Sequence, residues 1–273
     1  SKLGNLTYGS YNYYSSIGTV TKFNAYLKNM NAMSNNDSNY KNKPQAELLS
    51  AYFMNSSFPL EKITKNRINT LRPKLSFRVS PHPMKDYGGK GRRIDINNVF
   101  GTNRLSLGDS YEAGESITFG VDFKKQKKNE VFQTNEEGEI EYGKKKVTKI
   151  EEYFDFKLAQ VIRFSEEKKI PLNSTIDKKA SNIFGLAEYH HSENVNIKYD
   201  FSLTNDLDTF EYHQVVASYI ADNFTTEFSF AEYEGILGNA NVIGNTTTLT
   251  YKDYHNMSFS TRRNRKINLT EYY

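Results

Sequence analysis

The most constraining feature of the sequence is a strict alternation of apolar and polar residues over 116–124, in which the apolar positions are Ile117, Phe119, Val121 and Phe123. A period of two predicts a β-strand with one apolar face and one polar face. A soluble sheet buries such an apolar face in protein. An outer-membrane barrel instead turns it toward lipid and keeps the polar face for a wet lumen.

The same alternation recurs along the chain and is sharpest over 71–81, where Pro73 predicts an interrupted pairing or a bulge. Less regular alternation predicts further strands at 20–30, 154–163, 183–190, 195–203, 209–220, 224–232, 247–251, 257–261 and 267–272. Residues 45–60 fit either a strand or a short helix. The sum is about ten to twelve strands, nearly all neighbours in sequence, which predicts an all-β, antiparallel up-and-down meander.

Three connections are long. Residues 82–111 contain the sequence Gly88–Arg93, which we interpret as an exposed basic loop, while 165–181 have room for a helical turn at 173–179. A highly charged insertion near 125–151 is expected to be either disordered or a short hairpin pairing 130–133 with 139–142. A loop as long as 82–111 is uncommon in compact soluble domains and usual on the outer side of a membrane barrel.

Composition excludes several classes of protein. Aromatic residues reach 14% while mean hydropathy is −0.72, and the long aliphatic runs of a buried parallel sheet are missing. No stretch approaches the roughly 18 apolar residues of a transmembrane helix, a test that barrel strands escape because half of their residues are polar. A net charge of +4 is too weak to indicate nucleic acid.

The sequence contains no cysteine and shows no export signal at its start. We therefore expect either a cytosolic protein or an internal piece of an exported one, and we favour the second.

No catalytic or cofactor signature is found. The serines lack a G-x-S-x-G elbow, and Gly88–Arg93 lacks the spacing of a phosphate-binding loop. His190 and His191 are adjacent on a predicted strand, so they point to opposite faces and are a poor metal site. We predict no enzyme, no cofactor and no metal.

Five segments in sequence order, 71–81, 95–123, 157–171, 194–203 and 257–273, resemble the barrel domain of the lipopolysaccharide-assembly outer-membrane protein family LptD, also called the organic-solvent-tolerance (OstA) family. Residues 95–123 are the most specific. The resemblance implies that 1–273 is part of a large transmembrane barrel in the cell outer membrane, without its jelly-roll domain, signal peptide and last strands. It also implies lipopolysaccharide delivery to the outer leaflet, an LptE-like plug lipoprotein, and periplasmic bridge proteins that meet the jelly-roll.

The polar faces of the strands carry six candidate lumen residues for a phosphorylated head group: Arg72, Lys74, Arg78, Lys157, Arg163 and Lys198. The alternative is that they balance acidic neighbours such as Asp122, Asp155 and Asp200. The opposite faces carry the candidate lipid-facing residues Leu75, Phe77, Val79, Ile117, Phe119, Val121, Phe123, Phe154, Phe156, Ile197, Tyr199 and Phe201.

Two other readings stay open. The first is another outer-membrane barrel, such as a porin or nutrient transporter. The second is a soluble β-sandwich carbohydrate-binding module, which would be a stable monomer in water. An isolated piece of an open barrel would instead aggregate through its unpaired edges and apolar face.

Overall fold

The computed structural model describes residues 2–33, 43–132, 146–251 and 255–272. These residues form one antiparallel sheet of fourteen strands. The strands are β1 Lys2–Tyr14, β2 Val20–Ala32, β3 Gln45–Ser57, β4 Leu60–Ile63, β5 Arg67–Ser80, β6 Gly114–Phe132, β7 Lys146–Arg163, β8 Ala180–Ser192, β9 Val195–Leu203, β10 Phe210–Ala221, β11 Phe224–Tyr233, β12 Ala240–Tyr251, β13 His255–Asn264 and β14 Leu269–Tyr272.

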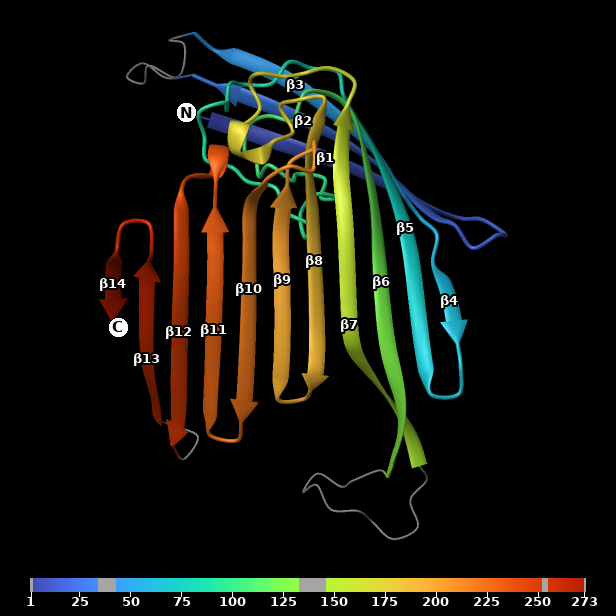
Figure 1. Cartoon of the computed structure of the whole chain (residues 1–273). Helices are drawn as coiled ribbons and strands as arrows, with labels where there is room; N and C mark the ends of the chain where they lie inside the picture. The colour runs from blue at the N-terminus through green and yellow to red at the C-terminus, as the bar shows by residue number, and fades with distance from the viewer. Residues whose placement is uncertain (1, 34–42, 133–145, 252–254, 273) are drawn as a thin grey trace.

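Nearly every strand pairs with its neighbours in sequence, and only the short β4 lies off the main path, against β5. Figure 1 shows this succession from β5 to β14. The predicted all-β antiparallel meander is confirmed, and the sheet is not closed. The structure has more strands than the ten to twelve expected, because β1 and β4 lack a readable alternation. β1 has tyrosines on both parities, and β4 is only four residues long.

Within the described residues, no helix is both long enough and apolar enough to cross a membrane.

Pro73 lies where the partner of β5 changes. On one side, β5 pairs with β6 without a register shift, and Pro73 lies opposite Val121. On the other side, the partner of β5 passes from β3 at Lys74 to β4 at Leu71. Proline has no N–H to give to a ladder, so the predicted interruption is found on that side only, without a bulge.

Other elements differ from the sequence prediction in their bounds. Residues 45–57 are strand rather than helix, and the turn expected at 173–179 is a 3₁₀ turn at Leu172–Ser174. The charged insertion is partly strand, since β6 runs to Phe132 and β7 begins at Lys146. Most of the hairpin expected between 130 and 142 lies outside the described residues.

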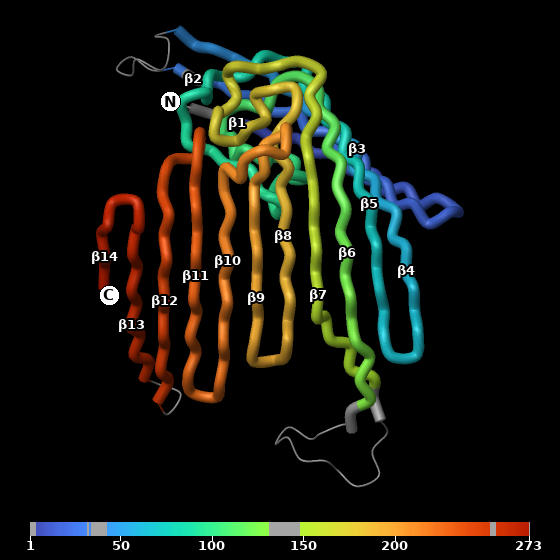
Figure 2. Tube along the Cα trace, viewed as in Figure 1, coloured from blue at the N-terminus to red at the C-terminus, as the bar shows by residue number. Residues whose placement is uncertain are grey.

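The two longest connections lie at one end of the sheet and the shortest turns at the other. At one end, the connections 81–113 and 164–179 join β5 to β6 and β7 to β8 (Figure 1). Figure 2 shows β1–β3 running across this same end. At the other end, two-residue turns join β8 to β9 and β10 to β11, and this is also the end where residues 133–145 connect β6 to β7. Outer-membrane barrels keep short turns on the periplasmic side and longer loops outside.

Candidate functional site

The strand register sorts the predicted residues onto two faces of the sheet. Opposed residues share a face, and Phe77, Ile117 and Ile162 form one such row across β5, β6 and β7. All twelve candidate lipid-facing residues lie on this apolar face. The six candidate lumen residues lie on the other face, together with Asp122, Asp155 and Asp200. That the first face meets lipid stays a prediction.

The polar face is covered at one end by the connections 81–113 and 164–179, which we call the cap. The cap and the strands beneath it share one hydrophobic cluster. Its members are Met84, Ile94, Ile96, Val99, Leu105, Leu107 and Ala113 from the first connection, Ile170 and Ile176 from the second, and Ala159, Val161, Phe184 and Leu186 from β7 and β8. The basic loop Gly88–Arg93 is exposed at residues 89–93, as the sequence predicts, whereas much of the rest of the first connection is buried. The first connection folds back because its apolar residues can be buried only against the sheet.

A buried ionic cluster fastens the cap to the sheet. The carboxylate of Glu112, in the cap, accepts hydrogen bonds from Nε of Arg104 at 2.8 Å and from Nη2 of Arg104 at 2.5 Å, so the two side chains form a bidentate pair. Nη1 of Arg163, on β7, lies 2.8 Å from the same carboxylate, and Nη1 of Arg78, on β5, lies 3.5 Å from it. No member of the cluster is more than 6% exposed. One carboxylate thus joins a loop to two strands.

The remaining donors of the three arginines bind oxygen atoms nearby. Arg78 donates to the carbonyls of Gly101 and Thr102, and Arg104 donates to the hydroxyls of Ser116 and Thr118. Buried charges are tolerated when they are paired and hydrogen-bonded in this way. Ser116 and Thr118, two polar positions of the alternation over 116–124, therefore bind the cap and do not face water in the lumen.

Charge in the cluster is unequal, since three guanidinium groups face one carboxylate and leave a net charge of +2. Burial alone would raise the pKa of Glu112, but the charges of Arg104, Arg78 and Arg163 outweigh burial and lower that pKa to about 2. The carboxylate is therefore ionised at neutral pH, and removing it would leave three buried cations together.

Two further contacts show how closely the cap fits. A Cβ added to Gly120 of β6 would lie 2.6 Å from the ring of Phe100, so this polar-face glycine makes room for a cap aromatic. At the far side of the cap, the guanidinium carbon of Arg93 lies 4.6 Å from the ring centre of Tyr212 on β10. The cap thus reaches from β6 to β10.

Beyond the cluster, two candidate lumen residues pair with acids on the polar face. Lys74 lies 2.5 Å from Asp122, and Lys157 lies 2.8 Å from Asp155. These pairs match the alternative that basic side chains balance acidic neighbours, while roughly a quarter of each lysine side chain stays accessible. Arg72 is exposed and Lys198 is partly exposed.

Arg78 and Arg163 differ from the other four candidates, because the cap buries them and Glu112 binds them. Sequence reasoning missed Arg104 and Glu112 entirely. The available signal was a pair of charged residues set among Val99, Leu105 and Leu107, in the segment most specific for the family resemblance.

The polar face beyond the cap has a different character. Over β10–β13 it presents mostly short polar side chains, as the register shows: Gln214, Ser218, Thr225, Glu227, Ser229, Thr246, Thr248, Ser258 and Ser260. We call this area the open half of the polar face. His190 and His191 lie at the end of β8, and no group of three or more histidine or acidic residues within the described parts of the chain could hold a metal ion.

In a comparison with protein-family models, residues 7–262 match the family described as LPS transport system D, LptD. A search of curated proteins finds no match.

Proposed function

The chain belongs to the LptD family of outer-membrane lipopolysaccharide transport proteins, and we propose on this premise that it helps deliver lipopolysaccharide to the outer leaflet. The observation that carries the proposal is the family match over 7–262 together with a sheet that has one apolar and one polar face. In the proposed mechanism, a hydrated lumen admits the polar head group while the acyl chains leave toward lipid. No covalent chemistry is needed.

Membrane seating in this proposal comes from the apolar face. Phe119 and Ile197 are 52% and 42% exposed, which is costly for a protein in water and favourable against acyl chains. The main hydrophobic cluster lies on the opposite side of the sheet, under the cap. All described strands join a single sheet, so the second sheet of a β-sandwich is missing from this part of the chain.

We propose that the head group follows the open half of the polar face rather than the capped half. Under the cap, side chains such as Ser116 and Thr118 are at most 2% exposed and bound to Arg104. Over β12 and β13, Thr246 and Ser258 are exposed and hydroxyl-bearing. Such groups exchange hydrogen bonds readily with sugars and water.

Phosphate contacts are proposed for Arg72, Lys74, Lys157 and Lys198, which lie outside the open half, on β5, β7 and β9, but keep accessible charged groups on the same polar face. For Arg78 and Arg163 we propose a different role, in which they hold the cap through Glu112. If Arg78 and Arg163 bound a phosphate instead, the buried carboxylate of Glu112 would lose two of its three cationic partners, which is energetically costly.

The proposed partners follow from the family. Further strands of the same protein would close the open sheet, a plug lipoprotein would occupy part of the lumen, and periplasmic bridge proteins would deliver lipopolysaccharide through a jelly-roll domain. The sheet edges at β1 and β14 carry unpaired backbone groups that further strands would satisfy.

Depletion of the full-length protein tests the proposal. Lipopolysaccharide at the cell surface is expected to fall while porin content is maintained, because a porin or nutrient transporter would not change surface lipopolysaccharide. A photo-cross-linker at Thr246 in the full-length protein is expected to capture lipopolysaccharide, and one at Thr118 is not. Unchanged surface lipopolysaccharide would contradict the function, and capture at Thr118 alone would contradict the route.

A further inference from the structure

We propose that the apolar face of β4–β6 ends in a binding site for the headgroups of anionic phospholipids. The site consists of Lys62 on β4, Lys65 in the following turn, Arg67 on β5, and Lys125 and Lys127 on β6. We call these five residues the basic row. The inference rests on the proposed membrane location and adds a lipid partner to it.

The register places the basic row directly beyond the apolar band. Leu60, Leu71 and Phe123 lie side by side across β4, β5 and β6 on the apolar face. Two residues further along each strand, the same face carries Lys62, Asn69 and Lys125. Apolar side chains thus give way to polar and basic ones from one row of the sheet to the next. Such a change is typical of the depth in a membrane at which acyl chains end and headgroups begin.

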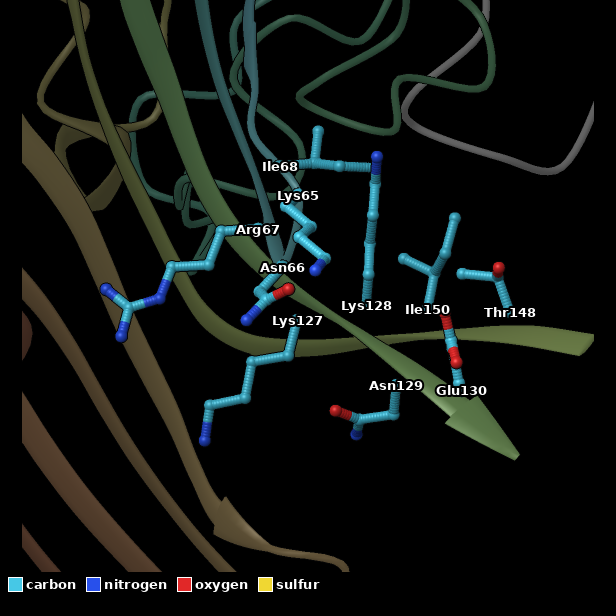
Figure 3. A pocket seen from close by; sticks show the side chains of 10 residues that line it. All are labelled: Lys65, Asn66, Arg67, Ile68, Lys127, Lys128, Asn129, Glu130, Thr148 and Ile150. Carbon is cyan, nitrogen blue, oxygen red and sulfur yellow. The ribbon is translucent and has the colours of Figure 1, made fainter.

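Two cations of the basic row are held side by side. Arg67 is directly opposite Lys127 in the β5–β6 register, and Figure 3 shows both side chains extending the same way. Like charges in directly opposed positions destabilise a sheet unless an anion lies between them. Among the described residues, no carboxylate forms an ion pair with a member of the basic row; Glu151, the other neighbour of Lys127, binds Lys149 at 2.9 Å.

The ammonium groups of two lysines in the basic row lie near aromatic rings. Nζ of Lys125 lies 5.4 Å from the ring centre of Phe123 and 5.6 Å from that of Phe154, and Nζ of Lys127 lies 5.0 Å from that of Tyr153. These are cation–π distances, so the two ammonium groups are held at the border between the aromatic side chains and the polar layer.

A hollow of about 920 Å³ opens beside Arg67 and Lys127 at this end of the strands. Its lining comes from both faces of the sheet, because Lys128 and Glu130 lie on the polar face. Figure 3 shows the side chain of Lys128 extending to the side opposite Arg67 and Lys127. Of the basic row, Lys65, Arg67 and Lys127 lie at the rim of this hollow.

The position of the short turns indicates which leaflet of the membrane the basic row faces. The basic row lies at the end of the sheet with the two-residue turns 193–194 and 222–223. Short turns mark the periplasmic side of outer-membrane barrels, and the periplasmic leaflet of that membrane is made of phospholipid. We therefore assign the headgroup to an anionic phospholipid rather than to lipopolysaccharide.

The test uses the full-length protein in vesicles that contain phosphatidylglycerol and phosphatidylcholine, followed by native mass spectrometry of the lipids retained. Wild type is expected to retain phosphatidylglycerol with a preference of about tenfold. The triple variant Lys62→Gln, Arg67→Gln, Lys127→Gln is expected to lose that preference. A matched triple variant at the other end of the sheet, Arg262→Gln, Arg263→Gln, Lys266→Gln, is expected to keep it.

Equal retention of phosphatidylglycerol by wild type and the first triple variant would overturn the site while leaving the barrel intact. Displacement of the lipid by millimolar inorganic phosphate would also overturn the site, since the basic row would then bind free anions rather than lipid headgroups. Failure of wild type to insert into vesicles would overturn both the site and the proposed function.

Discussion

Replacing Glu112 with alanine is expected to destabilise the cap by about 3–5 kcal/mol, the cost of removing one partner from a buried ion pair. The variant leaves Arg78, Arg104 and Arg163 buried together without a counter-charge. Because the sheet keeps its backbone pairing, the loss should appear as local opening of the cap rather than unfolding of the strands.

Hydrogen exchange on the full-length protein measures this effect. Amides of 99–113 are expected to exchange faster in Glu112→Ala, while those of β10–β12 are unchanged. Glu115→Ala is the matched control, because Glu115 is an exposed carboxylate three residues away, at the start of β6. Equal protection of the cap in Glu112→Ala and wild type would show that the hydrophobic cluster alone holds it.

Phe119→Arg is expected to cost about 2–4 kcal/mol in barrel assembly, since it would place a charge against acyl chains near the bilayer middle. Phe119 is 52% exposed on the apolar face, so no protein packing masks the effect. The fraction of full-length protein that reaches the outer membrane in its folded, heat-modifiable form measures the loss.

The control for Phe119→Arg is taken from the open half of the polar face. From the sequence alone, the adjacent Thr118 would be the natural control position. In the structure Thr118 is buried and binds Arg104, so an arginine there would disrupt the packing of the cap. Thr246 of β12 is exposed on the polar face, and Thr246→Arg is expected to assemble normally. Comparable losses in Phe119→Arg and Thr246→Arg would mean that the two faces are wrongly assigned.

The sequence predicts the strands and their two faces because alternation is a local property. β5, β6 and β7 have clear alternation, and the structure pairs them with the apolar parities on one face. β12 begins at Ala240, earlier than the expected 247, because its first residues are rich in glycine and asparagine and hide the pattern.

The cap could not be predicted in the same way. Its residues have no periodicity, so nothing local indicates that Val99 and Leu105 are buried against β7 and β8. The partnership of Glu112 with Arg78 and Arg163 joins three distant segments, and such contacts follow only from the sheet register. A buried role for these arginines therefore required the structure.

One measurement tests the central claim, that the apolar face meets acyl chains and the polar face meets water. The sequence has no cysteine, so a nitroxide label attached to a single introduced thiol reports on a chosen position. Labels at Phe228 and Leu249, on the apolar face, are expected to collide with oxygen, which partitions into lipid, and to avoid a water-soluble nickel chelate. Labels at Thr246 and Ser258, on the polar face, are expected to show the reverse. Labels on the apolar face that prefer the nickel chelate, or that are immobilised against a second layer of protein, would contradict the account.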